Sequence, residues 1–115
     1  MANNFKISGD FYVDALDGND SNAGTADAPF KTIGAGITAA DAAGSYQTIV
    51  VGTGVYNETL AMNSSAKYHT FKGDGRVILD GTGLTYAMTG NPAYSNIEDF
   101  TFSNYTGTFS YQEGK

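Results

Sequence analysis

A chain of 115 residues is long enough for one domain and too short for two. It contains no cysteine, which excludes disulfides, thiolate metal sites and a thiol nucleophile. Twelve acidic against six basic residues give a net charge of −6, which repels phosphate backbones and anionic membranes and argues against both as partners.

The chain has no apolar run near the ~18–20 residues that span a bilayer. Its start, Met-Ala-Asn-Asn-Phe-Lys, lacks the basic and then apolar layout of a signal peptide, so we expect a soluble protein without a leader. Fifteen glycines, eight tyrosines, seven phenylalanines and only two prolines are typical of short strands joined by tight turns.

The first predicted elements are a strand and a loop. Phe11–Val13 has the aromatic and β-branched character of a short strand. A polar loop over 14–28 follows, in which Gly18 and Gly24 suit positive φ angles. The loop is therefore expected to contain fixed turns.

A single helix is predicted over about 29–43. Pro29 suits the first helical position, and Gly44 stands where a helix would unwind. Gly34 and Gly36 each cost ~1 kcal/mol relative to Ala, so this helix must lie against an apolar surface. The apolar residues at helical spacing are Phe30, Ile33, Ile37 and Ala40.

Short apolar or β-branched runs separated by turn residues fill the rest of the chain. Aligning Phe71 with Phe100, or Ile78 with Phe102, gives a repeat in the twenties, as expected when successive coils stack. The predicted strands are Thr48–Val51, Thr59–Leu60, Tyr68–Phe71, Val77–Leu79, Ile97, Phe100–Phe102 and Thr108–Tyr111.

Three segments over about 11–81 read "FYVDALDGNDSNAGTADAPFKTIGAGITAA", "TIVVGTGVYNETL" and "FKGDGRVILDG". Their order of aromatic strand, Gly-Asn-Asp loop, Pro-Phe-Lys-Thr-Ile helix, strand and Gly-x-Tyr turn resembles the N-terminal part of the right-handed parallel β-helix (pectate-lyase-like) superfamily. Two features depart from that pattern: Thr53 replaces a proline before Gly54, and "GSYQT" replaces a shorter link.

The resemblance implies a mostly β fold, a short right-handed parallel β-helix over 11–115 with an N-terminal capping α-helix at about 29–43. It also implies that "SNIEDFTFSNYTG" is a further coil, with Asn104 where coils often place a stacked Asn. Family catalytic residues usually lie on later coils, so no catalytic residue carries over. The structural and cap residues that it implies are Pro29, Phe30, Ile33, Ile37, Gly54 and Tyr56.

The acidic loop has two interpretations. A calcium site is one, but an EF-hand register from Asp17 has Asn22 where glycine is required and Ala28 where the closing Glu belongs. Side-chain turns to the loop's own backbone are favoured, and neither a metal nor a cofactor is expected. The residues concerned are Asp14, Asp17, Asn19 and Asp20.

Other candidate catalytic residues have structural alternatives that we favour. Asp80 and Asp99 could face each other across coils as glycosidase carboxylates do at ~5–9 Å, but Asp80 precedes Gly81 as in a turn. His69 has no triad motif and is expected to pack or to lie at the surface. Arg76 and Lys72 could clamp an anion or act as a lyase base, but are expected to solvate a strand edge.

Surface residues suggest two kinds of glycan contact. Asn57-Glu58-Thr59 and Asn63-Ser64-Ser65 match glycosylation acceptors. Exposed tyrosines could stack sugars, which leaves a glycan open as a ligand. The tyrosines expected at the surface are Tyr46, Tyr86, Tyr94 and Tyr105.

Together these features favour a non-enzymatic structural virion protein of a bacteriophage, made in the host cytoplasm. It would be a capsid decoration (cement) protein or the attachment domain of a tail fibre or tailspike, with residues 1–10 as an arm docking on a neighbouring capsid or tail subunit. A short solenoid leaves its C-terminal end open, so we expect cover from a virion partner, from residues beyond Lys115, or from further copies, with a trimer expected from the phage members.

Two alternatives stay open because the superfamily also contains polysaccharide lyases and hydrolases, and fold does not settle function. One is the N-terminal capping piece of an extracellular polysaccharide lyase or hydrolase. The other is a carbohydrate-binding module that uses exposed tyrosines.

Overall fold

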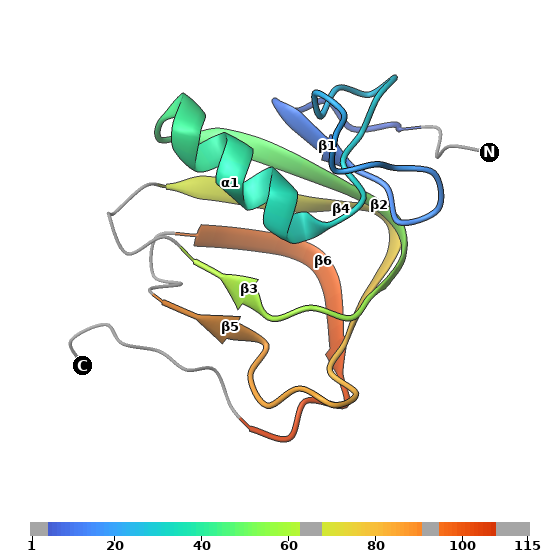
Figure 1. Ribbon diagram of the computed structural model, residues 1–115, viewed down its shortest axis with the longest axis vertical. Helices are drawn as coiled ribbons and strands as arrows, with labels where there is room; N and C mark the ends of the chain where they lie inside the picture. The colour runs from blue at the N-terminus through green and yellow to red at the C-terminus, as the bar shows by residue number, and fades with distance from the viewer. Residues whose placement is uncertain (1–4, 63–67, 91–94, 108–115) are drawn as a thin grey trace.

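The computed structural model describes residues 5–62, 68–90 and 95–107. It is mostly β, with a four-stranded and a two-stranded parallel sheet and one helix (Figure 1). The elements are β1 (Phe11–Val13), α1 (Ile33–Ala43), β2 (Gln47–Tyr56), β3 (Leu60–Ala61), β4 (His69–Asp80), β5 (Met88–Thr89) and β6 (Ser95–Ser103).

The larger sheet has the order β1-β2-β4-β6, and the smaller sheet pairs β3 with β5. The repeat in the twenties is confirmed, since Ile49 pairs with Phe71 and Phe71 with Ile97. The alignments of Phe71 with Phe100 and of Ile78 with Phe102 are wrong, because Ile78 pairs with Thr101. A shift in register between Lys72 and Val77 changes the offset along the strand, and a single alignment of sequences cannot follow such a change.

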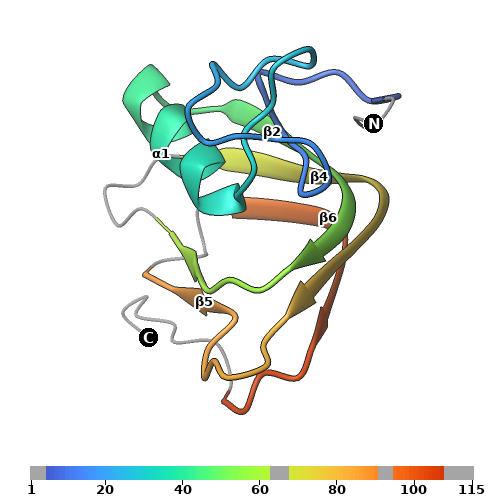
Figure 2. The ribbon, with the colours of Figure 1, turned by 45° about the vertical axis from the view of Figure 1, so that its right-hand side comes forward.

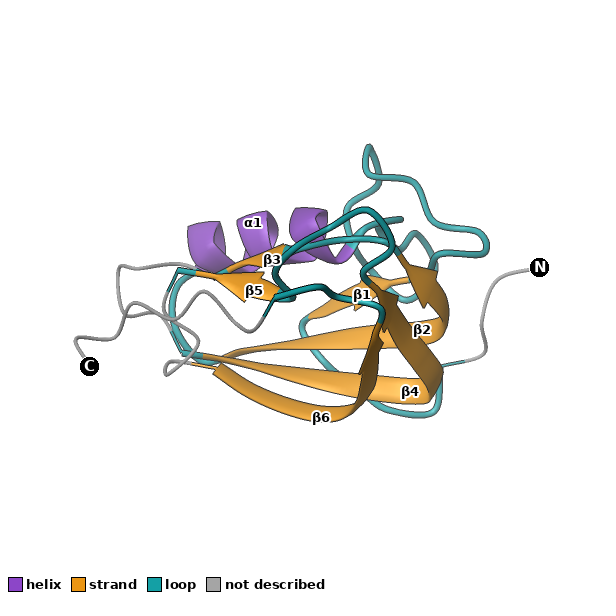
Figure 3. Cartoon of the chain, turned by 90° about the horizontal axis from the view of Figure 1, so that it is seen from below, coloured by secondary structure: helices purple, strands orange, loops and turns teal. Residues whose placement is uncertain are grey.

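Bends in the long strands explain why several predicted strands merge. β2, β4 and β6 each continue through a sharp bend (Figure 3), and β2 and β4 shift register between Gly52 and Gly54. Tyr68–Phe71 and Val77–Leu79 therefore belong to one strand, as do Ile97 and Phe100–Phe102. Gly54 and Tyr56 lie within β2 and not in a turn. The predicted strand Thr108–Tyr111 lies outside the described residues.

Helix α1 starts later than predicted. Thr32 is its N-cap, so Pro29 is not the first helical residue. Phe30 instead extends the sheet: it forms an isolated parallel bridge with Val13, and its N–H donates to the Tyr12 carbonyl at 2.9 Å. The C-terminal end at Gly44, with φ of 123°, agrees with the prediction.

The helix packs on β1 and β2, as its two glycines required. Its own side chains Ile33 and Ile37 are buried. A Cβ on Gly36 would lie 3.1 Å from Val13 Cγ2 and 3.3 Å from Ile49 Cγ2, so the glycine lets the helix approach the sheet closely. Figure 2 shows α1 at the top of the molecule, with β2, β4 and β6 following one below another. No helix within the described residues combines the length and apolar character needed to cross a membrane.

Of the two loop glycines, Gly24 has the expected positive φ of 87°, whereas Gly18 is not among the positive-φ residues. Gly18 is needed for space instead. A Cβ there would lie 2.1 Å from the Phe30 carbonyl oxygen and 2.4 Å from that of Asp14.

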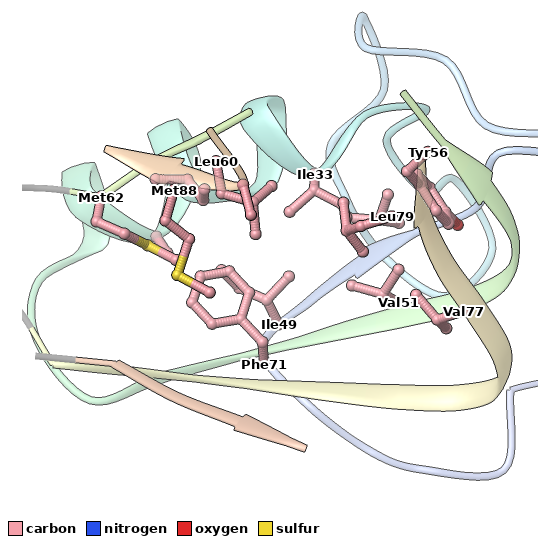
Figure 4. Close-up of a cluster of buried hydrophobic side chains, with 14 of the residues drawn as sticks. Ile33, Ile49, Val51, Tyr56, Leu60, Met62, Phe71, Val77, Leu79 and Met88 are labelled. Atoms are coloured by element: carbon pink, nitrogen blue, oxygen red, sulfur yellow. The ribbon is translucent and has the colours of Figure 1, made fainter. Parts of the chain in front are cut away.

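The core lies between the two sheets. Leu60 and Met88 face Ile49 and Phe71 across it (Figure 4). Towards β6 the apolar side chains are only half-buried, as seen for Ile97, Phe100, Phe102 and Tyr105.

Residues 5–10 lie along the chain's own sheet. The Lys6 and Ile7 N–H groups donate to Asp74 Oδ2 at 2.6 and 2.9 Å. Gly9 approaches Val50, which is fully buried. Docking of the arm on another subunit stays a prediction.

Candidate functional site

Two carboxylates from distant parts of the chain meet at the N-terminus of α1. Glu58 accepts the Ile33 N–H at 2.8 Å with Oε2 and the Gly34 N–H at 2.9 Å with Oε1. Asp20 Oδ1 accepts the N–H groups of Lys31 and Thr32, both at 2.9 Å. The first N–H groups of a helix have no partner within the helix, so Glu58 supplies the acceptors for two of them, and Asp20 holds the two residues that precede the helix. Both carboxylates add the negative charge that the helix dipole favours.

The surroundings shift the two carboxyl pKa values in opposite directions. Burial raises the pKa of Glu58 above its usual range; the hydrogen bonds from Ile33 and Gly34 offset only part of this, and the charge of Asp20 adds to it. Partial burial alone would also raise the pKa of Asp20. Its hydrogen bonds from Thr32 and Lys31, with the Lys31 charge, outweigh burial and hold the pKa below its usual range.

A hollow of about 250 Å³ lies beside this capped end. The Lys31 ammonium in its wall donates to the Ala15 carbonyl at 2.9 Å. Because both Glu58 oxygens accept backbone N–H groups, the carboxylate anchors the helix and is poorly placed to exchange protons with a ligand. The hollow is lined by Ala15, Lys31, Thr32, Val55, Tyr56, Asn57 and Glu58.

The two capping carboxyls are expected to act on stability in different pH windows. The Asp20 pKa is lowered from 3.8, so its contribution is present above that pH and lost as pH falls through the folded-state pKa. The Glu58 pKa is raised from 4.5, so the stability linked to its protonation is present below that pH and lost as pH rises through the folded-state pKa, while the bonds from Ile33 and Gly34 remain. In urea unfolding measured across pH, the free energy of unfolding of Asp20→Asn should depend less on pH at the acid end than that of the parent. The free energy of unfolding of Glu58→Gln should depend less on pH above 4.5. Superimposable profiles of the variants and the parent would contradict this assignment.

Tyr56 links β2 to the loop that follows β1. Its buried hydroxyl accepts the Ala15 N–H at 3.1 Å and donates to the Gly52 carbonyl at 2.7 Å. Burial raises the pKa of this phenol above its usual range, so the hydroxyl stays neutral. Tyr56 thus ties β2 to this loop from within a strand and not from a turn.

Tyr56→Phe is expected to lower the free energy of unfolding by about 2 kcal/mol, because it leaves two backbone groups without their partner. Urea unfolding measures the change. Tyr46→Phe is the control, since the Tyr46 side chain is 79% exposed and should change stability by less than ~0.5 kcal/mol. Equal effects of the two substitutions would argue against the buried network.

The acidic loop makes side-chain turns, as favoured. The buried Asp14 carboxylate accepts the Leu16 N–H at 2.9 Å, and Asn19 Oδ1 accepts the Ser21 N–H at 2.8 Å. Among the described residues, no group of three or more His, Cys, Asp or Glu side chains is arranged to hold a metal ion.

Asp80 and Asp99 do not face each other. Asp80 pairs with Ser103, whereas Asp99 lies at the bend of β6, roughly 13 Å earlier along the strand. Asp80 Oδ1 accepts the Thr82 N–H at 3.1 Å, which confirms the turn, and the Asn104 amide at 3.0 Å. The bond from Asn104 and those from Thr82 hold the pKa of Asp80 below its usual range.

Asn57, Asp80 and Asn104 form a polar ladder at the ends of three successive long strands. The Asn57 amide donates to the Asp80 carbonyl at 2.6 Å and to the Thr82 carbonyl at 3.0 Å. The ladder agrees with the stacked position expected for Asn104, with an aspartate on the middle rung. As a glycosylation acceptor, Asn57 would have to give up these bonds, and Asn63 lies outside the described residues.

His69 packs and is not a surface residue, being 4% exposed. Its Nε2 lies 2.8 Å from Asp41 Oδ1, and its Nδ1 accepts the Gln47 N–H at 3.4 Å. Both ring nitrogens therefore have partners within the fold. The imidazole ties the end of α1 to β2 and has no nitrogen left to activate a nucleophile.

The tyrosines divide into exposed and structural ones. Tyr46 and Tyr86 are exposed as expected, at 79% and 40%, and Tyr94 lies outside the described residues. Tyr105 is half-buried, and its hydroxyl donates to the Glu58 carbonyl, so its assignment to the surface is wrong. Burial raises the pKa of Tyr105 to about 12. Tyr68, 45% exposed, stacks on Tyr46 with ring centroids 5.7 Å apart, a contact that the sequence reading missed.

Comparisons with known proteins support the architecture but name no activity. A family model described as "Protein of unknown function (DUF1565)" matches residues 16–63, and this family is associated with right-handed β-helix proteins. The matched segment runs from the acidic loop through α1 and β2 to Glu58 and β3, and so contains the capped helix. Neither a curated protein nor a solved structure matches the chain.

Proposed function

We propose that this chain forms the N-terminal, helix-capped end of a right-handed parallel β-helix and acts as a non-enzymatic structural module. Three long parallel strands, stacked in chain order opposite β3 and β5, support this architecture. Parallel crossover connections are right-handed in nearly all proteins. Helix α1 packs across β1 and β2 at one end of the stack, where it would act as the cap.

The observation that carries the structural role is how the acidic side chains are used. Several of them accept hydrogen bonds from backbone N–H groups of this chain, and His69 bonds within the fold through both nitrogens. Groups held in this way fix the backbone and do not offer free acids or bases to a substrate. The carboxylates concerned are Asp10, Asp14, Asp20, Glu58, Asp74 and Asp80.

The test is the solution mass of the isolated chain by light scattering, with a far-ultraviolet dichroism spectrum of the same sample. A folded, β-rich particle of one defined mass is expected, whereas a spectrum without β-rich dichroism would contradict the proposed β-helix end. Release of reducing or unsaturated ends from polygalacturonate would contradict the non-enzymatic role. A bacteriophage virion as the location, capsid or tail subunits as partners, and a trimer as the assembly stay predictions from the sequence.

A further inference from the structure

An open hollow of about 660 Å³ lies where β4 and β6 bend. It forms because β4 and β6 have different numbers of residues at the bend. Between the paired positions before and after the bend, β4 contains residues 73–76, whereas β6 contains only Asp99. The shorter path of β6 leaves space that stacked strands of equal length would fill.

The hollow is lined by two glycines and by side chains of mixed character. A Cβ on Gly73 would come within 2.4 Å of the Asp99 carbonyl oxygen, so this glycine lets β6 approach β4 closely at the bend. Phe100 is half-buried and offers an apolar wall. The lining residues are Gly73, Gly75, Arg76, Val77, Asp99, Phe100 and Thr101.

Arg76 and Asp99 place one positive and one negative charge in this hollow. Within residues 5–62, 68–90 and 95–107, neither side chain makes a hydrogen bond or an ion pair; the Arg76 backbone N–H donates to Thr53 Oγ1 at 3.2 Å. Most other carboxylates near the strands bind backbone N–H groups. Asp99 also has φ of 63°, a conformation that is uncommon outside glycine and that often marks functional positions.

We propose that the hollow binds a short peptide with free ends, of two or three residues. The peptide carboxylate would pair with Arg76 and its ammonium group with Asp99, while an apolar side chain would lie against Phe100. A volume of about 660 Å³ falls within the usual range for small-ligand pockets. Asp99 would repel a ligand that carries only negative charge, which disfavours phosphates and acidic sugars.

The test is a two-dimensional NMR titration of the full ¹⁵N-labelled chain with the tripeptide Ala-Gly-Phe. Saturable shifts are expected at the amides of Gly73, Gly75, Asp99 and Thr101. The same peptide with an acetylated N-terminus and an amidated C-terminus should bind at least ~10-fold more weakly, because it has lost both charge-assisted contacts.

Arg76→Gln and Asp99→Asn should each raise the Kd for Ala-Gly-Phe at least ~10-fold. Asparagine tolerates positive φ, so Asp99→Asn should keep the bend intact. Lys72→Gln and Glu98→Gln are matched controls, because this cross-strand pair precedes the bend and does not line the hollow. Both controls should leave the Kd unchanged.

Three results would overturn the proposal. One is the absence of saturable shifts with Ala-Gly-Phe up to about 10 mM. The second is equal binding of the blocked peptide, which would remove the charge argument. The third is saturation of the same amides by galactose or galacturonate but not by the peptide, which would make the hollow a sugar site.

Discussion

Glu58→Ala is expected to lower the free energy of unfolding by about 3 kcal/mol, because two N–H groups at a half-buried helix end lose their acceptor. The loss should also loosen α1 from the sheet, since Glu58 follows β2 and so connects the helix to the strand on which it packs. Urea unfolding gives the free energy. Amide hydrogen exchange of Ile33 and Gly34 reports the helix end directly and should accelerate.

Two further variants separate the hydrogen bonds from the charge. Glu58→Gln keeps one acceptor oxygen and removes a charge that burial disfavours, so its loss should be about 1 kcal/mol. Glu98→Ala, at an exposed position in β6, should change stability by less than ~0.5 kcal/mol. Similar losses for Glu58→Ala and Glu98→Ala would show that the cap contributes nothing to stability in solution.

The sequence could predict which segments form strands and a helix, because those assignments depend on local patterns. Phe11–Val13 and the end of α1 at Gly44 were predicted correctly for this reason. The start of the helix was not, because Phe30 has helical spacing to Ile33 yet pairs with Val13. A tertiary contact thus outweighed a local pattern.

The partners of α1 could not be predicted, since Glu58 lies far from the helix in sequence and only the fold brings them together. The hollow at the bend was missed for a similar reason. Its origin is a difference in length between β4 and β6, which becomes visible only once the strand register is known. The stack of Tyr46 on Tyr68 did leave a sequence signal, because each tyrosine precedes one of two paired residues, Gln47 and His69.

Phe71→Ala is expected to have the largest effect, a loss of about 4 kcal/mol in the free energy of unfolding. Phe71 is fully buried in β4, which lies between the long strands β2 and β6, and it pairs with Ile49 on one side and Ile97 on the other. Met88 lies above it across the core (Figure 4), so the cavity would open at the junction of both sheets. Urea unfolding measures the loss, and a value below ~1.5 kcal/mol would contradict this packing.

Phe71→Leu and Phe102→Ala complete the comparison. Leucine keeps most of the buried volume, so its cost should stay near ~1.5 kcal/mol. Phe102 lies in β6 and is only half-buried, so Phe102→Ala should cost about 2 kcal/mol, clearly less than Phe71→Ala. Equal losses for the two alanine variants would contradict the lower burial of Phe102. They would mean that the β6 end of the core is covered in solution.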